Sequence, residues 1–451
     1  MSLLLAVRKG EDVMSTMKGN LRRTILTGVV GTMLAVGAMG TARADFASDK
    51  AAAILIYPKI VVDTSGTLTG GVKTNTELQI TNTSNSVIGV RCFLVDATSH
   101  CSNDPTKACT AETESLGSTN RQCDPTARCV PQWSENDFKM TLTKRQPVSW
   151  NALDGLSFLP LDPSNPVGKV GKGGQSNAGS TVRAVPEDPF VGALTCVEVD
   201  PSSFLPDSGF DPANNNGGDL KGEATIVSED DDQDVVDARK YNAVGMQSSA
   251  ANNGCGPNNH DCDGNQPTDP NTLLIGGSDA EYTGCPNVLI LDSLFDGATV
   301  HTHNFAGTST SSATVNSDLT LVPCSQDFNT LTMTTAVLQI LVFNEFEQRL
   351  STSTRVNCFR EVPLSDIDTP AGISGDKQSI FNVAVEGTLA GQARIRAVEG
   401  ANAANGVVGI IESFFTPLTP TPPRDSFSSA AANLHFTGSH MNADTMVLPA
   451  N

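Results

Sequence analysis

The feature that most limits the fold of this chain is a two-residue alternation of apolar and polar side chains. It is clearest in residues 74–95 (TNTELQITNTSNSVIGVRCFLV), where Leu78 and Ile80 alternate with polar neighbours. A period of two is that of a β-strand with one buried face. The polar run 82–85 favours a turn, and residues 88–94 then read as a return strand. We therefore predict an antiparallel hairpin in this segment.

A second segment, 337–359 (VLQILVFNEFEQRLSTSTRVNCF), follows the same plan. Both segments contain Leu-Gln-Ile before a polar turn, and both end in a strand with Arg, Cys and Phe. If the hairpins are equivalent, Cys92 and Cys358 face inward and Phe93 and Phe359 face the other side. A later pair of strands also recurs in the same order in the two halves, so we predict an internal duplication.

The whole chain shows the composition of an all-β protein. Short runs rich in Val, Ile and Thr are separated by Gly, Pro, Ser, Thr and Asn, and helical patterns are nearly absent. We predict two tandem Ig-like β-sandwich modules with long disulfide-clipped loops. The expected division is a first sandwich at 45–246 with a cysteine-rich insertion at 97–131, a linker or long loop at 247–280, a second sandwich at 281–415, and a Pro-rich spacer with a C-terminal strand at 416–451.

Residues 1–44 have the pattern of a secretory signal peptide. Basic residues at 18–23 precede an apolar run at 25–39, and Ala42-Arg43-Ala44 is a small-x-small cleavage site. The apolar run is shorter than the roughly 20 residues that a membrane span needs. We expect an exported protein of the periplasm, cell surface or extracellular medium, with no membrane span after cleavage.

Eleven cysteines follow this segment, and in an oxidising compartment they predict disulfides. We expect at least four of the five bonds that they can form, with one cysteine free or paired between chains. The insertion has the spacing C-x7-C-x13-C-x5-C, without the close pairs of a structural zinc site, which favours one or two local disulfides. The candidates are Cys92, Cys101, Cys109, Cys123, Cys129, Cys196, Cys255, Cys262, Cys285, Cys324 and Cys358.

The chain is acidic, with a formal net charge of −20. Such a charge disfavours nucleic acid and anionic lipid as partners and favours divalent cations. Asp261, Asp263, Asn265 and Asp269 surround a glycine as at the start of a calcium loop. The closing Glu is absent, because position 272 is Thr, so the sequence favours a disulfide-clipped acidic loop over a calcium site.

Motifs for catalysis are missing from the sequence. There is no G-x-S-x-G, H-E-x-x-H, Walker loop or C-x-x-C-H, and no catalytic residue or other cofactor site can be named. His301 and His303 would lie on one face of a strand, but no third metal ligand is near them in sequence, which favours exposed polar histidines. Paired carboxylates have no linear signature, so glycosidase chemistry stays open.

The predicted hairpin resembles the Ig-like modules of exported bacterial proteins. The phrases VPEDPFVGALTCVEVD (185–200) and VFNEFEQRLSTS (342–353) are similar to stretches of uncharacterised secreted bacterial proteins. This resemblance implies an exported β-sandwich protein and brings no activity, ligand or catalytic residue with it.

Two function hypotheses follow. The first is an extracellular or cell-surface structural or interaction protein, which contacts a protein, a surface polymer or a second copy through the loops at 97–131 and 247–271 and not by catalysis. The alternative is a secreted carbohydrate-binding module or glycosidase, whose sugar platforms would need exposed Trp or Tyr. Four of the five such residues, Trp150, Tyr57, Tyr241 and Tyr282, lie in or beside predicted strands, and Trp133 is the exception.

Overall fold

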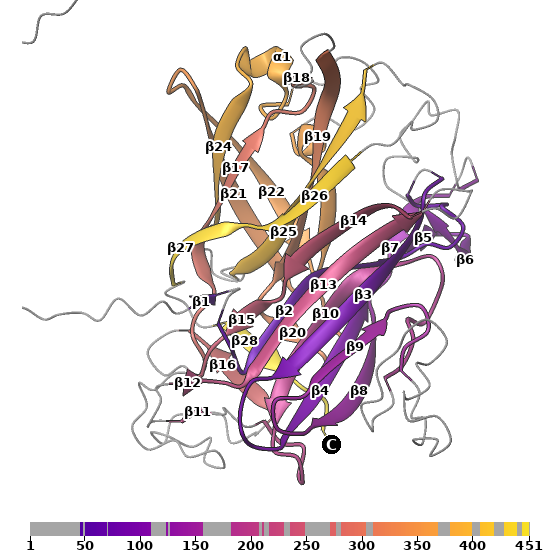
Figure 1. Cartoon of the computed structure of the whole chain (residues 1–451), viewed down its shortest axis with the longest axis vertical. Helices are drawn as coiled ribbons and strands as arrows, with labels where there is room; N and C mark the ends of the chain where they lie inside the picture. Colours follow the sequence, from indigo (N-terminus) through magenta and orange to yellow (C-terminus); the bar gives the residue numbers. More distant parts are fainter. Residues whose placement is uncertain are drawn as a thin grey trace, which may run out of the picture. The chain divides into compact units, whose positions relative to one another are not determined.

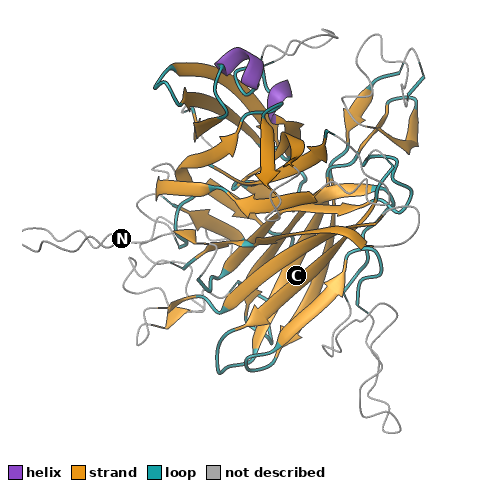
Figure 2. Ribbon diagram, turned by 45° about the horizontal axis from the view of Figure 1, so that its top comes forward, coloured by secondary structure: helices purple, strands orange, loops and turns teal. Residues whose placement is uncertain are grey.

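The computed structural model describes most of the chain after residue 45. The described residues are 46–47, 50–69, 71–109, 123–124, 127–156, 182–206, 210–211, 216–229, 235–248, 271–276, 281–303, 310–368, 379–398, 406–418, 428–439 and 444–450. Strands dominate, as predicted, and among these residues helix is confined to a 3-10 turn, η1 (Leu364–Asp366), and a single α-turn, α1 (Val383–Glu386) (Figure 2). Within these residues no helix has both the length and the apolar character to cross a membrane.

The first sandwich consists of two antiparallel sheets (Figure 1). One has the order β1 (Phe46–Ala47), β15 (Val244–Met246), β2 (Ile54–Val62), β10 (Phe190–Val199), β4 (Ile88–Asp96) and β8 (Ser134–Leu142). The other has the order β14 (Val235–Asn242), β13 (Leu220–Glu229), β3 (Lys73–Asn82) and β9 (Pro147–Asn151). Apolar side chains of both sheets form one core between them, which includes Leu78, Ile80, Val90 and Trp150.

The second sandwich also consists of two sheets with a core between them. Its first sheet has the order β22 (Arg349–Asn357), β21 (Thr335–Asn344), β24 (Ala390–Ala397), β17 (Pro286–Leu294) and β27 (His435–Ser439). Its second has the order β18 (Thr299–His303), β19 (Thr310–Pro323), β25 (Val407–Pro417) and β26 (Ser428–Asn433), with β23 (Arg360–Pro363) also paired to β19. Leu289, Ile340 and Ile395 of the first sheet meet Leu319 and Leu321 of the second in its core.

Three small sheets complete the described structure. The cysteine-rich insertion forms β6 (Asp104–Cys109), β5 (Ser99–Cys101) and β7 (Cys129–Pro131). A short pair joins β11 (Phe210–Asp211) to β12 (Asn216–Gly217). The third sheet joins β16 (Thr272–Ile275), β28 (Asp444–Val447) and β20 (Gln326–Asp327), and its β20–β28 pairing is parallel.

The central strand β2 is buried along its whole length. Its sequence, ILIYPKIVV, is almost continuously apolar because the strand contributes to two cores, with Leu55 and Tyr57 on one face and Ile54 and Ile56 on the other. The pairing register with β10 shifts beside Pro58, as expected for a residue that has no backbone N–H to donate.

The hairpin predicted at residues 74–95 is wrong. β3 pairs with β13 and β9, whereas β4 pairs with β10 and β8 in the opposite sheet. The connection crosses between the layers, and Asn82 supports it by accepting a 2.8 Å hydrogen bond from the backbone N of Ser84. Crossing places apolar side chains of both strands, such as Leu78 and Val90, in one core, and it gives each strand two ladder partners.

The second segment does form a hairpin, because β21 pairs with β22 from Thr335–Asn357 to Phe343–Arg349. The two segments are therefore not equivalent, and the structure does not confirm a duplication. The alternation within β4 is as predicted: Cys92 belongs to the core of the first sandwich and Phe93 to the core on the other face of the sheet. Cys358 is buried just beyond the end of β22.

The two sandwiches share apolar cores where they meet. Ile410 of β25 lies in the core of the first sandwich. The core on the other face of β2, β4 and β10 also contains Val322, Phe328 and Val408. Phe93 stacks on Phe328, with ring centroids 4.5 Å apart and planes at 10°. Residues 44–451 accordingly group into one compact unit.

Candidate functional site

Four disulfides connect eight of the nine described cysteines, as the sequence predicted. They are Cys92–Cys196, Cys101–Cys123, Cys109–Cys129 and Cys285–Cys324. Cys92 and Cys196 are directly opposite each other on β4 and β10. Cys358 is free and buried, and burial raises the pKa of its thiol to about 11, so that it stays protonated and unreactive at neutral pH. Cys255 and Cys262 lie outside the described residues.

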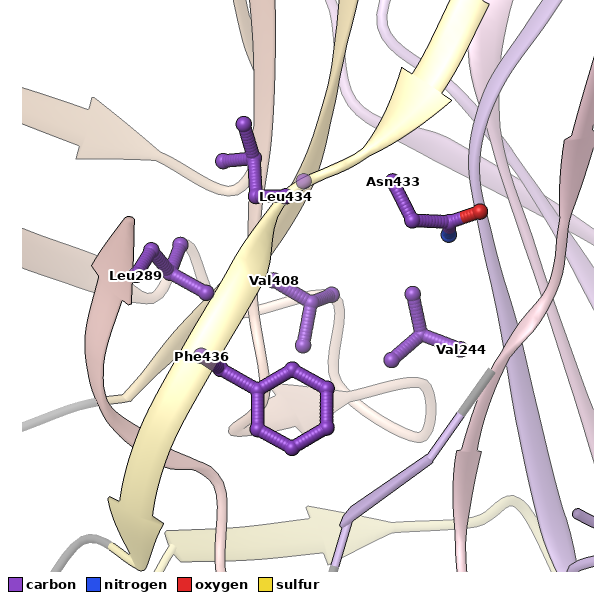
Figure 3. Close-up of a pocket in the computed structure, with 7 residues that line it drawn as sticks. Val244, Leu289, Val408, Asn433, Leu434 and Phe436 are labelled. Atoms are coloured by element: carbon purple, nitrogen blue, oxygen red, sulfur yellow. The ribbon is translucent and has the colours of Figure 1, made fainter. Parts of the chain in front are cut away.

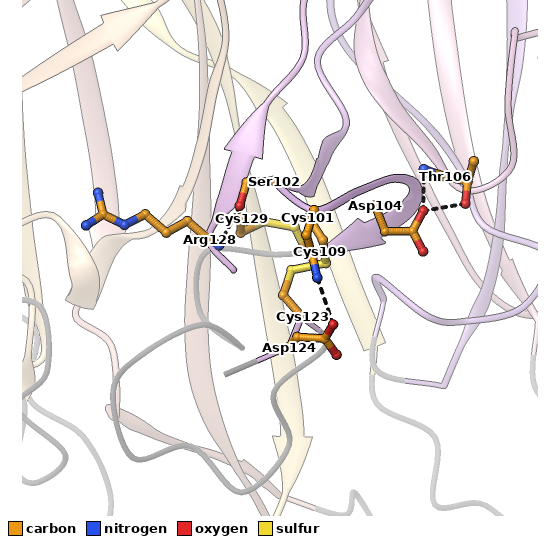
Figure 4. Close-up of a disulfide and its surroundings, with 10 residues drawn as sticks. Cys101, Ser102, Asp104, Thr106, Cys109, Cys123, Asp124, Arg128 and Cys129 are labelled. Carbon is orange, nitrogen blue, oxygen red and sulfur yellow. Dashed lines mark hydrogen bonds between the residues drawn. A yellow bond between two sulfur atoms is a disulfide. The ribbon is translucent and has the colours of Figure 1, made fainter. Parts of the chain in front are cut away.

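The cysteine-rich insertion has a small core of its own (Figure 4). Cys101, Cys109, Cys123 and Ala127 are buried together, with Cys129 packed against them. Both local disulfides predicted for this segment are present there. We call the described residues between 97 and 131 the cysteine excursion.

Several exposed polar residues lie on the surface of the cysteine excursion, which also exposes Val130. The side chain of Asn103 donates a 2.7 Å hydrogen bond to Asp124, and the hydroxyl of Ser102 accepts a 3.0 Å bond from the backbone N of Arg128. The Arg128 side chain extends away from the disulfides (Figure 4). Lys107 and Arg128 are both exposed, so this surface offers donors and positive charge on an otherwise acidic chain.

The base of the cysteine excursion is held by buried polar groups of the first sandwich. His100 is 1 % exposed, and its Nε2 lies 3.1 Å from Oε2 of Glu187. Burial, and then the neighbouring Asp96 carboxylate, raise the pKa of Glu187, against an opposing effect of His100. The hydroxyl of Thr98 accepts a 2.9 Å hydrogen bond from the backbone N of Val191. These contacts fix where the cysteine excursion leaves the sheet.

Two groups in the described part of the chain bring three residues of metal-ligand type within 4.8 Å of one another. They are Cys101 with Cys109 and Cys123, and Cys285 with Cys324 and Asp444. In both groups the sulfurs belong to disulfides, and a disulfide sulfur is not the thiolate that binds zinc. These cysteines therefore act as covalent links in this structure.

The candidate calcium residues, Asp261, Asp263, Asn265 and Asp269, lie outside the described residues. His301 is exposed, and its Nδ1 lies 2.8 Å from the hydroxyl of Ser312, which is the arrangement of a polar surface histidine. The candidate calcium site stays a prediction, and the surroundings of His301 agree with the exposed polar histidine that the sequence favours.

A buried charge cluster connects the two sandwiches, and no pattern in the sequence predicted it. Nζ of Lys59 contacts the carboxylates of Glu412 and Glu361, and Nε of Arg239 donates a 2.7 Å hydrogen bond to Oε1 of Glu412. Burial raises the pKa of Glu412, but the attraction of Lys59 and Arg239 outweighs it, so the net direction is down. We call Lys59, Arg239 and Glu412 the junction cluster. Each charge in it is paired, which indicates a structural role.

Side chains also join the edges of the two sandwiches next to the junction cluster. Oδ1 of Asn433 on β26 accepts a 3.0 Å hydrogen bond from the backbone N of Asn242 on β14, and Nδ2 of Asn433 donates a 2.7 Å bond to the Asn242 carbonyl. The Asn433 amide thus takes the place of a peptide group in a strand ladder. Two sheet edges are covered in this way without a continuous backbone pairing.

One hollow at the same junction is too small for a ligand. It is lined by Val244, Leu289, Val408, Gly409, Asn433, Leu434 and Phe436 (Figure 3). Its volume is about 10 Å³, which is about the room that one water molecule needs. The lining is mostly apolar, so the hollow is a packing space and not a substrate site.

The five Trp and Tyr residues all lie in the described part of the chain. Trp150, Tyr57, Tyr241 and Tyr282 are at most 2 % exposed, as the sequence predicted. Trp133, the exception, is partly buried and packs against the core that contains Phe93. None of the five forms an exposed platform on which a sugar ring could stack.

Comparisons with known proteins identify no family for this chain. No family model matches it, and no curated protein matches it. Among solved structures, a mutant of the CFA/I adhesin CfaE from enterotoxigenic E. coli aligns with 82% of this chain and 93% of its own, at 9% identity and a TM-score of 0.10. A TM-score this low supports no conclusion about fold or function.

Proposed function

We propose that this protein is an exported structural or interaction protein of the extracellular space or cell surface, which acts through surface contacts of the cysteine excursion. The observation that carries the proposal is the separate core of that segment. None of its described residues belongs to the three sandwich cores, and its own core consists of cysteines and one alanine. The cysteine excursion is therefore not needed to complete either sandwich.

The disulfides give this segment its order. Each closes a loop of 20 or 22 residues, and closing a loop of that size restricts the unfolded chain by about 3 kcal/mol. A segment ordered in this way presents its exposed side chains with little loss of entropy on binding. Disulfides that stabilise a protruding segment and no sandwich core favour a role for that segment in recognition.

The carbohydrate-active alternative has less support. Sugar-binding modules depend on exposed aromatic rings, and the Trp and Tyr residues of this chain are buried or packed against a core. The all-β, disulfide-bonded fold is compatible with an extracellular structural protein.

A deletion tests the proposal. The chain leaves and re-enters the first sandwich at adjacent points, because the backbone N of Gln132 donates a 3.2 Å hydrogen bond to the Thr98 carbonyl. Replacing residues 99–131 by an Asn-Gly turn should therefore leave both sandwiches folded. We expect the variant to keep the thermal midpoint of the full chain within a few degrees and to lose retention on the surface of the cells that export it, measured as the ratio of cell-bound to released protein.

A matched pair of triple variants separates contact from folding. Asn103→Ala, Lys107→Ala and Arg128→Ala together remove exposed groups of the cysteine excursion, whereas Asn85→Ala, Lys144→Ala and Arg355→Ala remove exposed groups elsewhere. Only the first triple should lower retention. If the folded deletion variant is retained as well as the full chain, the proposal is wrong.

A further inference from the structure

Three of the large apolar side chains that are exposed in the described structure gather at one end of the second sandwich. Phe346 is 68 % exposed, Leu389 51 % and Val385 42 %. Phe346 lies in the turn between β21 and β22, Val385 in α1, and Leu389 just before β24. The backbone N of Leu389 donates a 3.3 Å hydrogen bond to Oε2 of Glu345, so these segments are in direct contact. Single exposed apolar residues are ordinary, but such a group marks an interaction surface.

The turn that carries Phe346 is held rigidly. Oδ1 of the buried Asn344 accepts 3.0 Å hydrogen bonds from the backbone N of both Phe346 and Gln348. Nδ2 of Asn344 donates to Oε1 of Gln348 at 2.9 Å and to Oε2 of Glu386 at 3.0 Å. One amide group thus ties the turn to α1. Because the backbone of the turn is already held in place, little backbone entropy is lost when a partner covers Phe346.

The same surface is acidic. Glu345 and Glu347 flank Phe346 and are exposed. Glu386 is 4 % exposed, and its Oε1 has no hydrogen-bond partner among the described residues. Burial raises the pKa of the Glu386 carboxyl, against the opposing effect of the hydrogen bond from Asn344. A nearly buried carboxylate oxygen without a donor is costly, and a cationic donor from a partner would satisfy it.

We propose that this surface, which we call the acidic apolar tip, is a docking site for a protein segment that combines a large apolar side chain with Lys or Arg. The tip consists of Glu345, Phe346, Glu347, Val385, Glu386 and Leu389. The apolar side chain packs on Phe346 and Leu389, and the cationic group pairs with the carboxylates. This chemistry disfavours anionic lipid and nucleic acid, which the carboxylates repel. The site shares no residue with the cysteine excursion, so the two proposals stand or fall separately.

Peptide binding to the full mature chain tests this inference. The probe is a fluorescent peptide of three Lys-Phe-Gly-Ser repeats, and the comparison peptides replace each Phe by Ser or each Lys by Glu. We expect the Lys-Phe peptide to bind more tightly than both others, because it alone supplies both groups. Phe346→Ser should weaken its binding about tenfold or more, the range expected when a phenyl contact is lost.

Matched variants distinguish docking at the tip from general attraction to an acidic chain. Met333→Ser removes a side chain that is 52 % exposed elsewhere and should leave binding unchanged. Glu345→Gln with Glu347→Gln should weaken binding and reduce its dependence on salt. The inference is overturned if Phe346→Ser binds as well as the unchanged chain, if Met333→Ser weakens binding equally, or if the Lys-Ser peptide binds as tightly as the Lys-Phe peptide.

Discussion

Lys59 shows how a single residue acquires its role from the fold. It stands in an apolar run beside Pro58, at the point where the pairing of β2 with β10 shifts register. The side chain is 4 % exposed and meets Glu412, which is 0 % exposed, from a strand more than three hundred residues further along the chain. A charge so deeply buried persists only because it is paired, and it makes the junction cluster sensitive to the loss of any member.

The junction cluster allows a direct prediction at the residue scale. Glu412→Ala leaves Lys59 and Arg239 buried without their shared partner, and we expect it to lower the free energy of unfolding by about 3–5 kcal/mol. The control is Lys240→Ala, which removes an ion pair with Glu223. The Lys240 side chain is 54 % exposed. That change should cost at most about 1 kcal/mol. Urea unfolding of both variants measures the difference, and equal effects would mean that the junction cluster contributes nothing specific.

At the scale of elements, three of the four described disulfides divide into two kinds. Cys92–Cys196 connects two central strands inside the core of the first sandwich and spans 104 residues. The two bonds of the cysteine excursion span 22 and 20 residues and lie in a core of their own. The first kind restricts the unfolded state of a sandwich, whereas the second restricts only the segment that it closes.

Removing each kind of disulfide should therefore have different consequences. Cys92→Ala with Cys196→Ala is expected to destabilise the first sandwich by about 4 kcal/mol. Cys109→Ala with Cys129→Ala should leave the unfolding midpoint nearly unchanged while the cysteine excursion becomes open to proteolysis. Thermal unfolding and limited proteolysis of the two double variants check this, and a large fall in midpoint for the second would show that the excursion supports the sandwich after all.

For the whole molecule, the shared cores link the stability of the two sandwiches. Ile410 completes the first core, and Phe328 stacks on Phe93 across the junction. Separate domains with a small polar interface would unfold independently, but apolar cores built from both parts couple their unfolding.

This coupling can be measured with the natural tryptophans. Trp133 and Trp150 both belong to the first sandwich and its flanking core, whereas far-UV circular dichroism reports the strands of both sandwiches. We expect the two signals to change in a single coincident transition, and Phe328→Ala to shift both to lower temperature together. Two separated transitions, or a Trp signal that Phe328→Ala leaves unmoved, would contradict the coupling.

The sequence by itself determined that the fold is all-β and which apolar side chains of the alternating strands face a core. Leu78, Ile80, Cys92 and Phe93 lie on the predicted faces because alternation is a local consequence of strand geometry. The local disulfides of the cysteine excursion were likewise predictable, since the spacing of its cysteines lacks the close pairs of a structural zinc site.

Only the tertiary structure decided which strands are neighbours. The alternation of apolar and polar residues is the same in a strand that pairs with the next strand and in a strand whose successor lies in the opposite sheet. The pattern of residues 74–95 therefore could not show that β3 and β4 belong to different sheets. The junction cluster escaped prediction for a related reason. Its three charges come from β2, β14 and β25, and contacts between residues so distant in sequence leave no local pattern. The energy of a strand pairing or an ion pair depends on which strand or charged residue lies next to it, and the packing of the whole chain determines that neighbour.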